Sequence, residues 1–444
     1  MSKEYDYELV VIGAGSGGLA AAKRAAKLGK KVAIIEKNVV GGTCVNRGCI
    51  PTKLMIYAAE FAKQQVIACD YGWINPKGCF DWPIFKQAMD DHIESIRRSQ
   101  ADSLKGVDLI RGEAEFVDAH TLKVEGQAIA AKFVLLAVGG QPMMPDMPGI
   151  EHATDSRGAI DWETLPDSIV VVGGGYIGVE FAQVLKSFGC QVTIVESNSL
   201  LLDGFDGDVQ ARVKQFLIDD GIEVVDGVRL QKIVKKESLT AHLSNGKTLQ
   251  AEQILCALGR TPNTDRINLE AVGIETEKGM VTVNQQGRSQ VSNIFAVGDC
   301  TATMLLTPVA KAEGTAAVEA MFGEGDASVD YRWIPSAVFT HPEVAMVGLT
   351  ERAARDQYDN IVVRQNTFTP LKYAITATPL EAFIKVVADA ENQKILGLHM
   401  VGPRAADLVQ AMVPALKKGL SLGELSETIA IHPSTGEEMF CLET

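Results

Sequence analysis

The chain has 444 residues, of which 46% are hydrophobic and 22% charged, with a net charge of −14 and a pI near 5.1. This length exceeds a single hydrophobic core and indicates roughly two to four domains. The acidic balance argues against nucleic acid or an anionic membrane as the main partner, since both require basic surfaces. No apolar run reaches the roughly 18 residues that a membrane span needs, and Met1–Glu8 is polar, without the apolar core of a signal peptide. We therefore expect a cytoplasmic protein with no structural disulfide framework.

The N-terminal region has the pattern of a strand, a glycine loop and a helix. An apolar strand over Tyr7–Ile12 precedes a glycine-rich loop, a helical pattern runs through Leu28, and a second strand over Val32–Ile35 ends in an acid. A G-x-G-x-x-G loop in this context is typical of dinucleotide binding, since the helix N-terminus attracts the pyrophosphate and the acid accepts ribose hydroxyls. The predicted binding residues of this unit are Gly13, Gly15, Ser16, Gly17, Gly18 and Glu36.

Two cysteines separated by four residues, Cys44 and Cys49, lie just before a helical pattern over Pro51–Ile67. A helix N-terminus and the nearby Lys53 favour the thiolate form of a cysteine, and two thiols this close can form a disulfide and reopen it. A zinc site would need three or four ligands, and no second cysteine pair or histidine cluster accompanies these residues. We therefore interpret the pair as a redox-active dithiol and expect no metal.

The glycine-loop unit recurs in the middle of the chain. A further helical pattern covers Asp81–Leu104, and a linker rich in Gly, Pro and Met surrounds residues 139–155. The strand Ile169–Val172 then leads into a second glycine loop and helix, and in both units the acid lies 23 residues after the first glycine. Two dinucleotides in one chain suggest a flavin and a nicotinamide. The predicted residues of this second site are Gly173, Gly175, Tyr176, Ile177, Gly178 and Glu196.

The acid of the second unit bears on which nicotinamide nucleotide binds. Glu196 favours the free 2′-hydroxyl of NADH, whereas a 2′-phosphate would call for arginines. None occurs from Ser197 to Asp203. We therefore expect NADH to be favoured over NADPH.

A further segment has the pattern of a flavin contact. An apolar strand from Asn293 runs into Gly298-Asp299, and a helical pattern follows with Thr307 as the expected N-cap and Pro308 as its expected first residue. Asp299 suits a ribityl hydroxyl, and the helix N-terminus suits the anion of a reduced flavin. An ordinary strand–turn–helix remains the alternative for this segment.

The region from Tyr331 onward changes character and predicts a separate α+β domain. Its expected strands and helices are Ala337–Phe339, Phe383–Ala388, Ile395–Met400, Ala405–Lys418 and Leu422–Thr428. Near the end of the chain, His432 has the residue type for acid–base work on a thiol, with Glu437 as its orienting acid. A lone histidine near a chain end is more often an ordinary surface residue.

Taken in chain order, these motifs resemble the pyridine nucleotide–disulfide oxidoreductase family (class I), specifically its glutathione reductase branch. The matching motifs are the Gly13 loop, Cys44–Cys49, Gly173–Glu180, Gly259–Asn263, Gly298-Asp299 and His432–Glu437. The resemblance implies an α/β fold with two Rossmann-like dinucleotide-binding domains and a C-terminal dimerisation domain. The implied segments are 1–146 (FAD, first part), 147–262 (NAD(P)), 263–330 (FAD, second part) and 331–444 (dimerisation).

The resemblance also implies roles for individual residues. Hydride from NADH or NADPH would reach FAD beside Lys53 and its partner Glu180, with Tyr176 as a gate. Cys49 would be the thiolate next to the flavin, and Cys44 the thiol that attacks a small disulfide. Further residues implied to contact a cofactor are Gly42, Thr43, Ala114, Gly139, Gly259 and Arg260.

The same resemblance implies a homodimer. His432, held by Glu437, would then act on the partner subunit's site and protonate the departing thiol.

The chain departs from the glutathione reductase pattern at the positions where that branch binds its substrate. Lys23 and Thr315 stand where arginines bind glutathione carboxylates, Thr52 replaces a lysine, and no tyrosine counterpart occurs near Arg98–Leu104. Losing such clamps removes charge-assisted bonds worth roughly 1.5–3 kcal/mol each. A glutathione-type disulfide with less negative charge, such as glutathione amide disulfide, is therefore a plausible substrate.

Other hypotheses about the function remain open at this point. A dihydrolipoamide dehydrogenase also carries an acid at the position of Glu196, although the Ser-Thr-Gly-Glu-Glu run after the His432-Pro pair is closer to the glutathione branch. A mercuric reductase would want a C-terminal cysteine pair, whereas the chain offers only Cys441. A metal-ion or quinone reductase of the same family, or a redox-silent nicotinamide-binding module, completes the alternatives.

Overall fold

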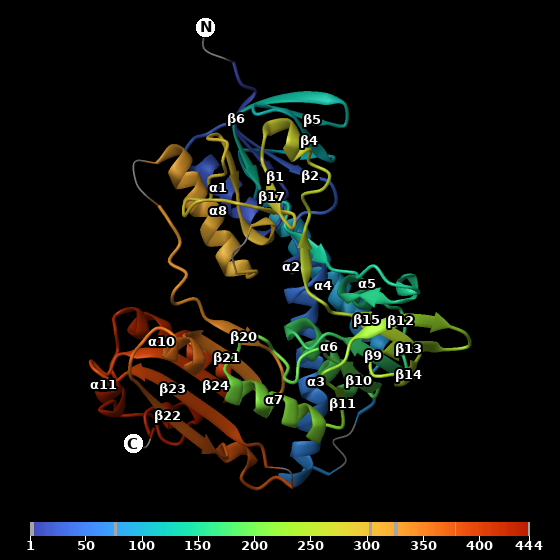
Figure 1. Cartoon of the computed structure of the whole chain (residues 1–444), viewed down its shortest axis with the longest axis vertical. Coiled ribbons are helices and arrows are strands. Elements are labelled where there is room, and N and C mark those ends of the chain that lie inside the picture. The colour runs from blue at the N-terminus through green and yellow to red at the C-terminus, as the bar shows by residue number, and fades with distance from the viewer. Residues whose placement is uncertain (1–3, 75–77, 302–303, 324–326, 378, 443–444) are drawn as a thin grey trace. The chain divides into compact units, whose positions relative to one another are not determined.

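The computed structural model of the chain describes residues 4–74, 78–301, 304–323, 327–377 and 379–442. It is an α/β protein (Figure 1), so the expected fold class with two Rossmann-like domains and a C-terminal α+β domain is confirmed. The chain divides into two compact units, each built from separate segments. Unit one comprises Met1–Pro51, Pro83–Met143 and Gly259–Val329, and unit two comprises Thr52–Trp82, Met144–Leu258 and Asp330–Thr444. The finer division into four segments stays a prediction.

Unit one is organised around a parallel sheet in the order β3-β2-β1-β6, with β19 beside β6. Its central strands β1, β2 and the second half of β6 are rich in Val, Ile and Leu and largely buried, as parallel sheets covered by helices require. Helices α1 (Ser16–Lys27) and α8 (Thr307–Phe322) lie side by side next to this sheet (Figure 1). The strands are β1 (Tyr7–Ile12), β2 (Val32–Glu36), β3 (Val107–Arg111), β6 (Gln127–Leu136) and β19 (Ile294–Ala296).

The first half of β6 continues into an antiparallel meander with β5 and β4, which the sequence did not reveal. Among the described residues, two further antiparallel pairs, β7 with β16 and β17 with β18, belong to the same unit. The bounds are β4 (Ala114–Asp118), β5 (Thr121–Val124), β7 (Gly140–Pro142), β16 (Arg260–Pro262), β17 (Thr276–Glu277), β18 (Met280–Val281), η2 (Leu269–Val272) and η3 (Gly298–Cys300).

Unit two contains the second dinucleotide-type sheet, in the order β11-β10-β9-β15-β8, with parallel pairing throughout. It repeats the arrangement of unit one, and an antiparallel sheet of β12, β13 and β14 packs on it. The elements are β8 (Thr154–Asp155), β9 (Ser168–Val172), β10 (Gln191–Val195), β11 (Glu223–Val225), β12 (Leu230–Lys235), β13 (Leu239–Leu243), β14 (Thr248–Ala251), β15 (Gln253–Cys256), η1 (Ile150–His152), α5 (Ser156–Ile160), α6 (Tyr176–Ser187) and α7 (Gly207–Asp219).

The C-terminal part of unit two is an antiparallel sheet in the order β20-β21-β24-β23-β22, with α10 packed on it (Figure 1). The predicted strands and helices of this region are all present within a few residues, whereas β21, β22 and α9 were not anticipated. The elements are β20 (Ser336–Val338), β21 (Glu343–Gly348), α9 (Glu351–Arg355), β22 (Ile361–Phe368), η4 (Leu371–Tyr373), β23 (Ala382–Asp389), β24 (Ile395–Gly402), α10 (Ala405–Lys417), α11 (Leu422–Ser426) and η5 (Thr435–Met439).

Three helices complete the description. The short helix α2 covers Gly42–Arg47, the long helix α3 covers Cys49–Asp70, and α4 covers Trp82–Asp102. The last two match the predicted helical patterns closely. Among the helices of the described residues, none combines the length and the apolar character that crossing a bilayer demands.

Candidate active site

Both glycine loops have the same strained geometry, which only glycine permits. Gly13 has φ +106° and Gly173 has φ +109°, a region that side chains other than glycine rarely adopt. A Cβ on Gly18 would lie 1.9 Å from the Gly13 carbonyl oxygen, and a Cβ on Gly178 would lie 1.9 Å from that of Gly173. The third glycine of each loop therefore allows the helix to begin directly against the turn, with its N–H groups free to face a phosphate.

The two acids at the strand ends are held alike by backbone N–H groups. Glu36 Oε2 accepts from Ala14 N at 2.8 Å, and its Oε1 accepts from Asn38 N at 2.8 Å. Glu196 Oε2 accepts from Gly174 N at 2.6 Å, and its Oε1 accepts from the N–H two residues further on at 2.8 Å. Each carboxylate is thus fixed beside its glycine loop with capacity left to accept from ribose hydroxyls.

The loops also leave the room that a dinucleotide needs. A Cβ placed on Gly175 or on Gly139 would meet nothing within 4 Å, and one on Gly15 would meet only Gly42 Cα, at 3.7 Å. A Cβ on Gly42 would lie 2.6 Å from Gly15 Cα, so these two backbones touch. Open space over a glycine backbone at a helix N-terminus fits a pyrophosphate.

A second group of predicted residues meets around Arg260 in unit one. Arg260 Nε lies 3.1 Å from Asp299 Oδ2, and the same guanidinium donates to Thr43 Oγ1 at 3.3 Å and to the Gly140 carbonyl. Next to this group, Gly298 N donates to Glu313 Oε2 at 2.7 Å in a buried contact. The polar end of a bound flavin would fit these side chains, and Glu313 is a member that sequence reasoning missed.

Two further predicted contact residues lie in strands or turns of unit one. Ala114 is buried at the start of β4 and pairs with Val124. Gly259 directly precedes β16, and its carbonyl accepts from Met143 N at 2.9 Å.

The cysteine pair lies at the junction of two helices. Cys44 is in the third position of α2, and Cys49 is the first residue of α3, so only Cys49 stands at the N-terminus of the long helix. Both are thiols in this structure. Asn46 between them donates to the Gly42 carbonyl at 2.8 Å and accepts from Arg97 of α4, which fixes the short helix.

The start of helix α8 brings a hydroxyl to this pair. Thr307 Oγ1 lies 3.7 Å from Cys49 Sγ. The predicted role of Thr307 as the helix N-cap is wrong: the cap position belongs to Leu306, and Pro308 is the second residue of the helix. The hydroxyl therefore faces the thiols instead of the helix N–H groups.

The two thiols share a hydrogen bond, so one of them ionises at the expense of the other. The pKa of Cys44 is lowered to about 6 by this hydrogen bond from Cys49, against the opposing effect of burial, with help from Thr307 and from the positive charge of Lys311. The pKa of Cys49 is raised, first by the same hydrogen bond and then by burial. In the reduced pair the thiolate near neutral pH is thus Cys44, the residue expected to attack the substrate, and not Cys49, for which the family resemblance implied the thiolate.

Lys311 also lowers the pKa of Lys23 on α1, although burial is the larger cause. Since Lys311 lies one helical turn beyond Thr307 on α8, the two residues share a face of that helix. The Lys311 ammonium therefore lies near the dithiol, and the sequence motifs did not indicate this cation.

In unit two, Lys53 and Glu180 both contact Phe339. The Lys53 ammonium lies 3.6 Å from the centre of the Phe339 ring, and Glu180 Oε1 accepts from Phe339 N at 2.8 Å. Lys53 Nζ also lies 3.6 Å from Glu343 Oε1. The expected Lys53–Glu180 pair itself stays a prediction, with Phe339 and Glu343 as additional residues of the same cluster.

Two other predicted residues of unit two lie at exposed positions. Tyr176 is 45% exposed at the first position of α6 and is followed by Ile177. The His432 side chain is 83% exposed, and its Nδ1 lies 2.9 Å from Glu437 Oε2. Glu437 also forms a capping box with Ser434. The pKa of Glu437 is lowered by the Ser434 N–H and then by His432, so it stays a carboxylate that can orient the imidazole.

Comparison with known proteins agrees with the family that the motifs resemble. Residues 7–314 match the family described as pyridine nucleotide-disulphide oxidoreductase, and residues 334–440 match its dimerisation domain. A glutathione reductase of Nostoc sp. is 37% identical over 452 residues, covering 98% of this chain and 98% of that protein. A dihydrolipoyl dehydrogenase of Geobacillus stearothermophilus is 36% identical over 442 residues, covering 97% of this chain and 94% of that protein.

Among solved structures, the HOCl-induced flavoprotein disulfide reductase RclA from Escherichia coli is similar with a TM-score of 0.88. It is 29% identical, and the match covers 98% of this chain and 99% of that chain. The chain belongs to the class I pyridine nucleotide–disulfide oxidoreductase family, in the glutathione reductase branch, and is an FAD-dependent disulfide oxidoreductase.

Proposed function

We propose that the chain is a homodimeric, NADH-dependent reductase of a small glutathione-type disulfide. The observation that carries this proposal is the Cys44–Cys49 dithiol beside Thr307, in a chain with two dinucleotide loops. The thiolate favoured near neutral pH suits attack on a disulfide. We also propose a cytoplasmic location, where the other cysteines of the chain would stay reduced.

The preference for NADH rests on the surroundings of Glu196. Its carboxylate is fixed beside the second glycine loop, where it would repel a 2′-phosphate. The nearby cation Lys214 is already held by Asp226 at 2.6 Å and by the Ser199 carbonyl at 2.9 Å. The described side chains therefore favour a ribose that carries a free hydroxyl.

The dithiol chemistry follows from the two sulfurs. Cys44 Sγ attacks one sulfur of the substrate, so a mixed disulfide forms and the substrate S–S bond breaks. The departing thiolate takes a proton from the partner subunit's His432, which Glu437 orients. Cys49 then attacks Cys44 Sγ, which releases the second substrate thiol and closes the Cys44–Cys49 disulfide. When bound, FAD supplies the route by which two electrons from the nicotinamide reopen that disulfide.

The substrate class follows from the balance of charges near the dithiol. Thr315 and Thr52 offer no charge where glutathione reductases have an arginine and a lysine, while Lys311 adds only one positive charge, so the balance is one cation fewer. We therefore propose a glutathione-type disulfide with fewer carboxylates than glutathione disulfide, such as glutathione amide disulfide.

The test is steady-state oxidation of NADH and NADPH by the purified flavoprotein against glutathione disulfide, glutathione amide disulfide, lipoamide, cystine and Hg(II). We expect NADH to exceed NADPH, and one glutathione-type disulfide to exceed lipoamide. A Cys44→Ser variant is the control and must lose disulfide turnover while it keeps bound FAD. Faster turnover of lipoamide would instead assign the chain to dihydrolipoamide dehydrogenase chemistry. No turnover with any disulfide would contradict the proposal.

A further inference from the structure

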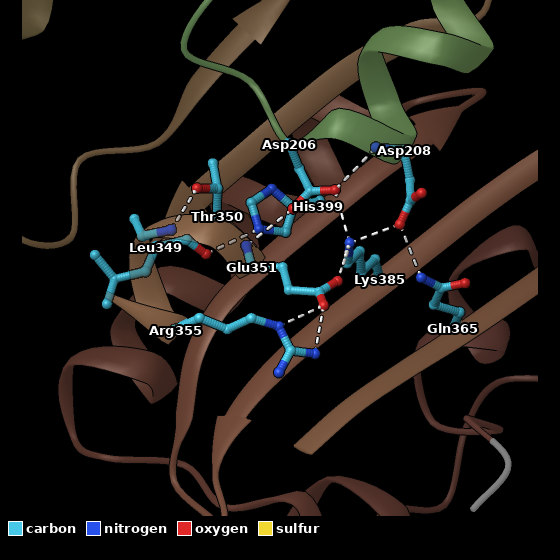
Figure 2. A network of polar contacts seen from close by, with 10 residues as sticks. Asp206, Asp208, Leu349, Thr350, Glu351, Arg355, Gln365, Lys385 and His399 are labelled. Carbon is cyan, nitrogen blue, oxygen red and sulfur yellow. Dashed lines mark hydrogen bonds and ion pairs between the residues drawn. The ribbon is translucent and has the colours of Figure 1, made fainter. Parts of the chain in front are cut away.

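A buried ion cluster in unit two is centred on Lys385, in the middle of β23. The side chain is 2% exposed, and its Nζ lies 2.8 Å from Asp206 Oδ1, 2.6 Å from Asp208 Oδ2 and 2.7 Å from Glu351 Oε2 (Figure 2). Burial opposes the charge of Lys385, but the hydrogen bonds to the three carboxylates outweigh it and raise its pKa. A buried ammonium needs such partners, so these groups must keep their mutual positions.

Outer contacts fix each carboxylate in turn. Arg355 Nε donates to Glu351 Oε1 at 2.9 Å, and Gln365 Nε2 donates to Asp208 Oδ2 at 2.9 Å (Figure 2). Asp206 accepts the backbone N–H of Asp208 at 3.1 Å through Oδ1 and that of Glu351 at 2.9 Å through Oδ2. The cluster therefore clamps the N-terminus of α7, whose N-cap is Asp206, onto the C-terminal sheet.

The histidine opposite Lys385 on the neighbouring strand is not a second cation of this cluster. His399 is fully buried and pairs with Lys385 in the β23–β24 register. Burial lowers its pKa, and its Nε2 lies 3.0 Å from the Leu349 carbonyl. Because the imidazole of His399 is neutral, Lys385 is the cation that pairs with the three carboxylates.

From α7 the contacts continue to the second glycine loop. Gln210 Nε2 on α7 donates to the Leu202 carbonyl at 2.7 Å, and Leu202 N donates to the Gly174 carbonyl at 2.9 Å. Leu202 is buried and has φ +56°, a left-handed conformation that persists only where its surroundings hold it. Leu201 is packed so closely that a Cβ on Gly174 would lie 2.4 Å from its Cδ2.

The segment 201–206 therefore connects the ion cluster to the nucleotide loop. Its last residue, Asp206, is clamped by Lys385, and its first residues touch Gly174, whose N–H also donates to Glu196. Because the segment is short and its conformation is strained, its position depends on the clamp at its far end.

We propose that Lys385 is a positioning residue for the nicotinamide nucleotide, acting through Asp206 and the segment 201–206 on the Gly174 loop. This inference rests on the proposed function, in which Gly173–Gly178 and Glu196 bind NADH. Lys385 touches no reacting group, so its loss weakens NADH binding and leaves the dithiol chemistry of unit one unchanged. A mutation that removes binding alone raises KM with kcat unchanged.

The test compares Lys385→Met with Arg212→Met, measuring kcat and KM for NADH together with the rise in Tm that NADH produces. Arg212 is the matched control: it also ties α7 to the C-terminal sheet, through Glu381 at 2.6 Å and Thr367 at 3.0 Å, but at the surface. We expect Lys385→Met to raise KM about tenfold or more, with kcat within about twofold, and to reduce the Tm rise. Arg212→Met should change neither.

A second variant guards against misfolding of Lys385→Met, which would appear as lost FAD. Asp206→Asn keeps the shape and an oxygen for the Glu351 N–H, and should raise KM for NADH with kcat unchanged. An unchanged KM in the folded variant would overturn the inference while the proposed function stands. If the wild-type chain itself fails to oxidise NADH with any disulfide, the proposed function fails first, and the inference fails with it.

Discussion

Replacing Thr307 with valine removes one hydroxyl from the dithiol and keeps the shape of the side chain. The hydroxyl lies 3.7 Å from Cys49 Sγ and is one of the groups that lower the pKa of Cys44 to about 6. Losing a group that stabilises the thiolate raises the pKa of Cys44. The nucleophile would therefore be less ionised at any pH below that new value.

The size of the effect follows from the strength of one hydrogen bond to a charged atom. Such a bond is worth about 1.5–3 kcal/mol, and we take the lower end because sulfur is a weak hydrogen-bond acceptor. Since one pKa unit corresponds to about 1.4 kcal/mol, the pKa of Cys44 should rise by about one unit. At pH 7 the thiolate fraction would then fall from roughly nine-tenths to about one half.

The assay is the rate of alkylation of Cys44 by iodoacetamide in the NADH-reduced protein, followed by peptide mass spectrometry between pH 4 and pH 9. Thr315→Val is the matched control, since this threonine lies two turns further along α8 and its hydroxyl donates to the Lys311 carbonyl at 3.0 Å. The control should leave the midpoint near pH 6, and Lys311→Met should raise it. A wild-type midpoint near 8.5, or a Thr307→Val midpoint equal to that of the wild type, would refute the reasoning.

Three further predictions concern other parts of the site. Gly178→Ala places a Cβ 1.9 Å from the Gly173 carbonyl and should abolish NADH binding, measured by titration of the flavoprotein, while FAD stays bound; an unchanged affinity would contradict the geometry. Glu437→Gln frees His432 from its carboxylate and should lower kcat for the disulfide without slowing reduction of FAD by NADH in stopped flow. Glu313→Ala leaves the Gly298 N–H buried without its acceptor and should cost about 1–3 kcal/mol, seen as a lower Tm and easier loss of FAD.

The glycine loops could be predicted because their determinants are local. The turn at Gly13, the close contact at Gly18 and the acid at Glu36 all lie within one short stretch of chain, and the second copy repeats the spacing. The redox cysteines could be predicted for the same reason, since both lie in one short segment that precedes a helix. Local rules of chain geometry are enough for such features.

Other features depend on contacts between distant residues and were missed for that reason. Thr307 reaches a cysteine 258 positions away, and Lys385 reaches Asp206 179 positions away. The one local signal for the ion cluster was a lysine within the apolar strand Phe383–Ala388, because a charge in a buried strand requires partners. The strands β21 and β22 were missed because their pairing partners, not their own sequences, decide that they are strands.

The way in which Glu36 and Glu196 are held has a consequence for affinity. Backbone amides of the loops immobilise both carboxylates before any ligand arrives, so folding has already met the rotational entropy cost of ordering them. A ribose then meets an acceptor that is preorganised, and little of its binding free energy is spent on arranging the protein. Shortening either side chain to aspartate would consequently destabilise the loop and also weaken binding of the ligand, since the backbone amides would lose their common acceptor.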